Sequence, residues 1–67
     1  MIQTFENNEF KATVEYCGND MHKVTYTGPG MDKPFENYIF NEDKEQGEKD
    51  SIIMAEKFVN SRGKYGK

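Results

Sequence analysis

Two neighbouring segments of this chain alternate between apolar and polar residues, and this pattern constrains the fold more than any other feature. The first alternation covers residues 10–16 and the second covers residues 22–27. The larger or apolar side chains share one side: Phe10, Ala12, Val14, Tyr16, His22, Val24 and Tyr26. A period of two is typical of β-strands with one buried face. We therefore expect these segments to form an antiparallel hairpin.

The residues between the two segments limit the register of this hairpin, because a slip of one residue places apolar side chains opposite polar ones. A two-residue turn at Gly18-Asn19 pairs Val14 with Lys23, whereas a three-residue loop over residues 18–20 pairs Val14 with Val24. The second register also pairs Ala12 with Tyr26, Tyr16 with His22, Thr13 with Thr25 and Glu15 with Lys23. Matched pairs each stabilise a sheet by about 0.2–1 kcal/mol, so we predict the three-residue loop.

Two further strands are expected beside this hairpin. Upstream, Asn7-Asn8 fits a two-residue turn that places Phe5 opposite Phe10. Downstream, a proline-closed loop over residues 28–34, with Met31 and Lys33 exposed, leads to a strand over residues 35–40. That strand carries large side chains on both faces, and a single helix covers only one face of a sheet. Which of its faces is buried stays open.

An amphipathic helix is predicted over residues 51–62, with Asp50 as N-cap and Gly63 just past its end. Its apolar face consists of Ile52, Met54, Ala55, Phe58 and Val59. Upstream, Asp43-x-x-Gln46 resembles a capping box. A continuation of the helix there turns Lys44 and Glu48 toward the core, so any helix over residues 43–50 is expected to overhang the sheet without packing.

The predicted fold class is therefore α+β: an antiparallel three- to four-stranded meander with one C-terminal amphipathic helix packed on one face. A chain of 67 residues is too short for two hydrophobic cores, so residues 1–67 are expected to form one domain. Only 34% of the residues are hydrophobic, but 13% are aromatic. The core must therefore depend on a few large rings.

No constellation in the sequence predicts catalysis. Cys17 and His22 are the single cysteine and histidine, which leaves no disulfide and no zinc-finger ligand set, and the predicted register puts them on opposite faces. Gly28-Pro29-Gly30 lacks the spacing of a phosphate-binding loop. The acidic residues 41–50 lack the spacing of an EF-hand. We expect a non-enzyme without metal or cofactor.

The chain contains no signal-peptide pattern and no apolar run of membrane-spanning length. Its single cysteine is typical of a reducing compartment. These features predict a cytoplasmic protein that does not contact a membrane.

Nucleic-acid binding is the second function considered. Three antiparallel strands followed by a helix is an element order similar to that of AP2-like and integrase arm-binding domains, and the resemblance implies a sheet laid in the DNA major groove. The residues available for phosphate contact are Lys11, Lys23, Arg62, Lys64 and Lys67. Twelve acidic and nine basic residues give a net charge of −3, the wrong sign for a general nucleic-acid binder. We therefore expect weak binding at most.

The preferred prediction is a non-catalytic protein-protein interaction module, such as a small phage or mobile-element accessory or inhibitor protein. Residues 41–50 carry five carboxylates and two lysines, which suits a basic partner such as a host nucleic-acid-handling protein. The candidate contact residues are Tyr38, Phe40, Glu42, Asp43, Glu45, Glu48 and Ile53. Dimerisation through the strand at residues 35–40 is a further alternative.

Overall fold

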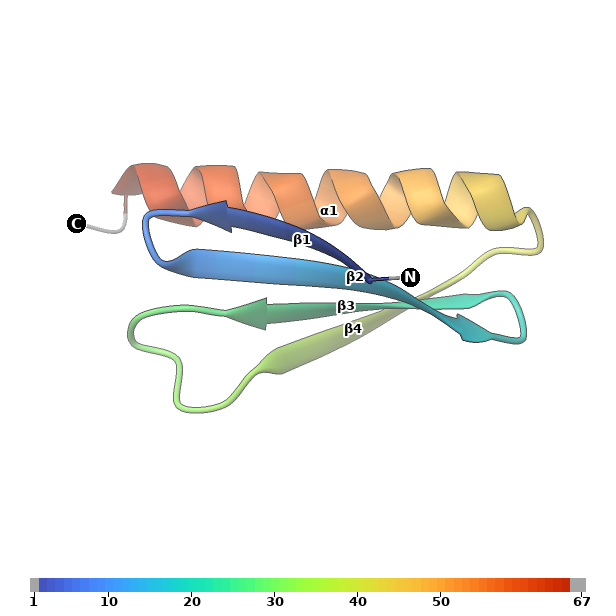
Figure 1. The fold of residues 1–67 in the computed structure, drawn as a ribbon, viewed down its shortest axis with the longest axis horizontal. Coiled ribbons are helices and arrows are strands. Elements are labelled where there is room, and N and C mark those ends of the chain that lie inside the picture. The colour runs from blue at the N-terminus through green and yellow to red at the C-terminus, as the bar shows by residue number, and fades with distance from the viewer. Residues whose placement is uncertain (1, 66–67) are drawn as a thin grey trace.

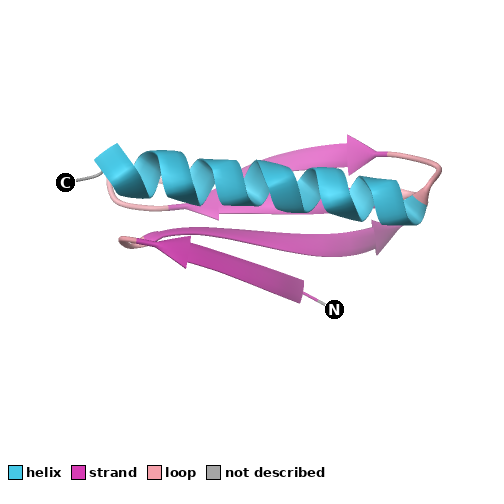
Figure 2. Cartoon of the chain, turned by 90° about the horizontal axis from the view of Figure 1, so that it is seen from above, coloured by secondary structure: helices cyan, strands magenta, loops and turns pink. Residues whose placement is uncertain are grey.

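The computed structural model describes the backbone of residues 2–65 and the side chains of residues 2–62. Four strands form one antiparallel sheet in the order β1 (Ile2–Asn7), β2 (Phe10–Gly18), β3 (Met21–Thr27) and β4 (Phe35–Phe40). One long helix, α1 (Lys44–Tyr65), lies across a single face of this sheet (Figures 1 and 2). The predicted α+β meander is confirmed, with four strands.

The core lies between α1 and the two central strands. Its buried members are Ala12, Val14, Val24, Tyr26, Ala55 and Val59. Phe10 is also buried, and its ring meets that of Phe58 edge to face with centroids 6.0 Å apart. Burial of a large apolar side chain stabilises the fold by about 1.5–3 kcal/mol. The alternation in β2 and β3 places such side chains on the face that packs against the helix.

The β2–β3 register is confirmed, and the turn differs in one detail. Every predicted pair from Ala12–Tyr26 to Tyr16–His22 is present. The turn itself contains two residues, Asn19 and Asp20, both with positive φ, and Gly18 pairs with Met21. Cys17 is the extra residue of a β-bulge. A bulge beside a glycine of positive φ, followed by a two-residue turn, joins the strands without changing the register.

The predicted turn between β1 and β2 is wrong by one position. The turn consists of Asn8 and Glu9, so Phe5 lies opposite Ala12 and not opposite Phe10. The predicted turn would have placed Glu6 directly opposite Glu9, and like charges in that position are destabilising. In the structure Glu6 faces Lys11. The two registers differ by two residues, so both keep Phe5 on the same face of the sheet.

The expectation that a helix over residues 43–50 would overhang the sheet without packing is also wrong. Asp43 caps the helix, because its Oδ1 accepts hydrogen bonds from the backbone N–H groups of Glu45 (3.1 Å) and Gln46 (3.2 Å). Gly47 is buried against His22.

The two charged side chains on the core side of this segment both find partners in the sheet. Lys44 places its Nζ 4.4 Å from the ring centroid of Tyr16, and Glu48 accepts a 2.8 Å hydrogen bond from Gln3. Asp50 and Ser51, predicted as the helix start, therefore lie in its second turn. At the other end Gly63 lies inside the helix, a shift of the size by which helix ends commonly vary.

Candidate functional site

The face of the sheet opposite α1, called here the outer face, is not covered by any part of the chain that the structure describes (Figure 1). The strand pairings place the following side chains on it: Ile2, Thr4, Glu6, Lys11, Thr13, Glu15, Met21, Lys23, Thr25, Thr27, Glu36, Tyr38 and Phe40. Most are small, polar or charged, which is typical of an antiparallel sheet with one face toward solvent. One apolar exception is Ile2 on β1, which is 57% exposed, and the others lie at β4 and the adjacent end of β3.

Tyr38 and Phe40 are the large side chains that β4 turns toward the outer face. Tyr38 is 53% exposed and Phe40 is 67% exposed. Phe40 pairs with Met21 of β3, and the Tyr38 hydroxyl donates a 3.3 Å hydrogen bond to Glu36. These three residues, Met21, Tyr38 and Phe40, form what we call the β4 patch. The structure thus assigns the alternate set of β4, which includes Ile39, to the helix side.

The charges around the β4 patch are paired or negative. Lys23 lies 3.8 Å from the carboxylates of both Glu15 and Glu36, and Lys11 faces Glu6 across the β1–β2 ladder. The outer face therefore carries three carboxylates against two lysines. This balance does not provide the positive surface that phosphate contact needs.

The four predicted acidic contact residues cluster at the start of α1, but they are not equivalent. Asp43 is engaged as the helix cap and Glu48 by Gln3. Glu42 and Glu45 are exposed and form no hydrogen bond or ion pair through their side chains with any described residue. Carboxylates at a helix N-terminus interact favourably with the helix dipole. The acidic stretch therefore has a structural role besides any role in binding.

Ile53 does not join the β4 patch. It is 49% exposed on the side of α1 that faces away from the sheet, with Lys49 and Lys57 one turn away on either side. Because α1 covers the face opposite the patch, Ile53 and Phe40 lie on opposite sides of the molecule. These predicted contact residues cannot form one continuous surface.

The residues of the nucleic-acid alternative are also divided. Lys11 and Lys23 lie on the outer face, whereas Arg62 lies on α1. Lys64 and Lys67 are outside the residues whose side chains are described.

Cys17 and His22 are separated, as the predicted register requires. His22 is only 3% exposed beneath α1, its ring lies 5.0 Å from that of Tyr16, and its Nδ1 has no hydrogen-bond partner. Cys17 is exposed at the bulge.

Among the described residues no three His, Cys, Asp or Glu side chains gather as metal ligands. In that same part of the chain, no helix is long and apolar enough to span a membrane.

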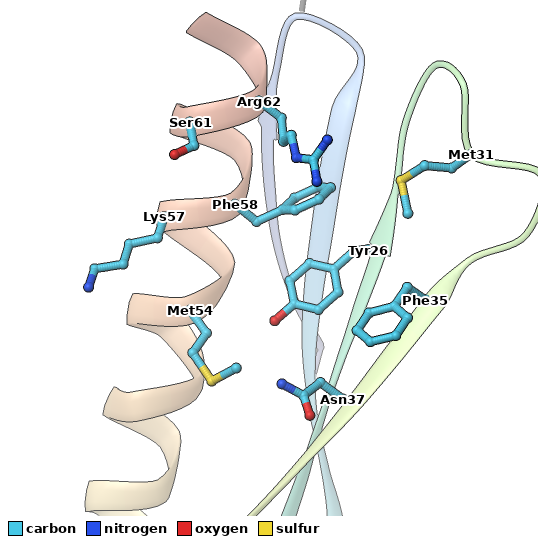
Figure 3. Close-up of a pocket in the computed structure, with 9 residues that line it drawn as sticks. All are labelled: Tyr26, Met31, Phe35, Asn37, Met54, Lys57, Phe58, Ser61 and Arg62. Carbon is cyan, nitrogen blue, oxygen red and sulfur yellow. The ribbon is translucent and has the colours of Figure 1, made fainter. Parts of the chain in front are cut away.

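A groove between α1 and the β3–β4 edge escaped the sequence analysis. It has a volume of about 650 Å³ and is lined by Tyr26, Met31, Phe35, Asn37, Met54, Lys57, Phe58, Ser61 and Arg62 (Figure 3). The three spacings of about 4.8 Å between four strands span about 14 Å, while a helix with its side chains is about 10–12 Å wide. One helix therefore leaves one margin of this sheet uncovered. The predicted number of strands and helices was enough to indicate such an uncovered margin.

Comparison with protein-family models, with curated proteins and with solved structures finds no match to this chain.

Proposed function

We propose that this protein is a non-catalytic protein-interaction module that binds its partner through the β4 patch. One observation carries the proposal: Tyr38 and Phe40 are more than half exposed on adjacent same-face positions of a single edge strand. Aromatic side chains dominate the energetics of protein interfaces, and exposed apolar clusters commonly mark them.

The preferred partner is a basic protein. Glu15 and Glu36 flank the patch on the outer face. Two further carboxylates lie near its other end: Glu42 follows Phe40 by two residues, and the backbone carbonyl of Asp20 accepts a 3.0 Å hydrogen bond from the backbone N–H of Asn41. Such a negative rim accelerates encounter with a positive surface and contributes less to final affinity. Small size and the lack of a recognisable catalytic motif support an accessory or inhibitor role, such as phage and mobile elements encode.

The test is affinity capture from a host-cell lysate with three forms of the protein. Wild type and the control variant Ile53→Ser are expected to retain the same basic partner. The double variant Tyr38→Ser, Phe40→Ser is expected to lose it. Ile53 is a matched control because it is a similarly exposed apolar residue on the opposite side of the molecule. Equal capture by all three forms, or capture of nothing by wild type, would contradict the proposal.

Pairing of two copies through β4 remains a prediction. No described strand pairs with the outer edge of β4, and an antiparallel pairing centred on Asn37 would place Phe35 opposite Ile39 and Glu36 opposite Tyr38. No like charges meet in that register. Sedimentation equilibrium measures it, since the mass would rise from 7.8 kDa toward twice that value with concentration.

A further inference from the structure

The groove between α1 and β4 contains a row of aromatic rings, which form its floor. Tyr26 lies between the other two, with its ring centroid 4.7 Å from Phe58 and 5.8 Å from Phe35. Met31 and Met54 flank this row in Figure 3. Phe35 is 59% exposed although it faces the helix side. The groove therefore exposes aromatic surface that the single helix is too narrow to cover.

The polar groups at the groove are suited to an anionic ligand. Arg62 directs its guanidinium toward the rings at one end, and the Tyr26 hydroxyl and the Asn37 amide lie toward the other (Figure 3). Lys57 lines the outer rim and extends away. None of the nine lining residues is acidic, and Arg62 forms no ion pair with a described residue. An apolar site with a few convergent polar groups is the usual form of a binding pocket.

The position of the groove favours an extended peptide as the occupant. It opens beside β4, an edge strand whose outer backbone groups pair with no described strand. A chain that adds to β4 as a further strand would turn alternate side chains toward the helix side and so into the groove. A small molecule would leave much of itself in solvent at so open a site.

We propose that the groove binds an extended segment of a partner protein that carries a bulky apolar side chain and, two residues away, a carboxylate. The apolar side chain packs on Phe35, Tyr26 and Phe58. The carboxylate pairs with Arg62. This site lies on the opposite face of β4 from Tyr38 and Phe40, so it goes beyond the proposed function and fails or succeeds independently of it.

The experiment titrates the labelled protein with blocked pentapeptides and follows backbone amide signals by NMR. The probe is Thr-Phe-Thr-Glu-Thr, and its matched controls replace Glu by Lys or Phe by Ala. We expect the probe at millimolar concentration to shift the amides of Tyr26, Met31, Phe35 and Phe58, and both controls to bind at least twofold more weakly.

Variants separate the groove from the rest of the surface. Arg62→Glu is expected to weaken the acidic probe about two- to fivefold, the range for an exposed ion pair, and to favour the Lys peptide. Lys49→Glu changes the same charge away from the groove and should leave binding unchanged, as should Tyr38→Ser.

Three outcomes would overturn the proposal. In the first, groove signals do not shift at millimolar probe. In the second, the Glu and Lys peptides bind wild type equally. In the third, the groove signals shift with protein concentration alone, which would identify a second copy of this chain as the occupant.

Discussion

Gly28 illustrates how a single methyl group affects this core. A Cβ at this position would overlap the ring of Phe10, which is itself buried and held against Phe58. The ring cannot move away without opening the core, so Gly28→Ala is expected to lower the free energy of unfolding by about 1–3 kcal/mol. Urea denaturation measures this. Lys33→Ala, an exposed change in the same loop, should stay within about 0.5 kcal/mol of wild type.

Gly47 shows two opposing effects at one residue. Alanine is favoured over glycine inside a helix by about 0.5–1 kcal/mol. A Cβ on Gly47 would lie 3.2 Å from Nδ1 of His22 and 3.3 Å from Cβ of Asn41, closer than ordinary contact. Since His22 is buried and cannot swing aside, we expect Gly47→Ala to yield none of the helix gain.

A double-mutant cycle tests this explanation. In a His22→Ala background the same Gly47→Ala change should recover part of the roughly 0.5–1 kcal/mol typical of helices, since the contact with Asn41 remains. An equal effect of Gly47→Ala in both backgrounds would show that the His22 contact is not the cause.

At the scale of the element, α1 contains most of the acidic stretch together with basic residues near its C-terminal end. Its N-terminal part carries Glu45, Glu48 and Asp50, and its C-terminal part carries Lys57 and Arg62, an arrangement that complements the helix dipole. The charge segregation along the sequence is thus explained by helix stability. Asp43, which the sequence predicts as a partner-contact residue, also caps the helix.

We predict that Asp43→Ala lowers the free energy of unfolding by about 0.5–2 kcal/mol, the usual effect of losing an N-cap. Asp43→Asn retains an acceptor oxygen and should have a much smaller effect. Glu42→Gln, an exposed change one residue upstream, serves as the control in thermal denaturation. If Ala and Asn at position 43 are equally destabilising, charge and not capping is the relevant property.

At the scale of the whole molecule, no described residue forms a covering layer on one face of the sheet, and the helix leaves one margin of the other face open. These two open regions differ in charge: the outer face carries Glu6, Glu15 and Glu36, whereas the groove carries Arg62. The two proposed binding surfaces therefore differ in charge, and neither is a continuous positive surface among the described residues.

We predict no sub-micromolar binding of DNA or RNA at about 0.15 M salt, where the Debye length is about 8 Å. Lys23 is already paired with two carboxylates, and Lys11 is separated from Arg62 by the sheet. An electrophoretic mobility shift assay with duplex DNA and single-stranded RNA decides this. Tight binding there would promote the nucleic-acid alternative over protein binding.

Local patterns determined the hairpin of β2 and β3 and the apolar stripe from Ile52 to Val59. The alternation within each segment is a sufficient signal for these elements. In the hairpin it also fixes the register, since a one-residue slip would move every apolar side chain to the wrong face. The predicted β1–β2 turn is wrong because the two registers keep the same faces of the sheet. They differ in cross-strand partners: Phe5 meets Phe10 or Ala12, and Glu6 meets Glu9 or Lys11.

The start of α1 and the groove depended on contacts between distant parts of the chain. Lys44, Gly47 and Glu48 are residues that the sequence alone does not predict in a packed helix. In the structure they contact Tyr16, His22 and Gln3 of the sheet, respectively. The uncovered margin likewise follows from where α1 rests, mainly on β2 and β3 and least on β4. A periodicity reports which face of an element is buried, but it contains no information about the partner that buries it or about how much of the sheet that partner covers.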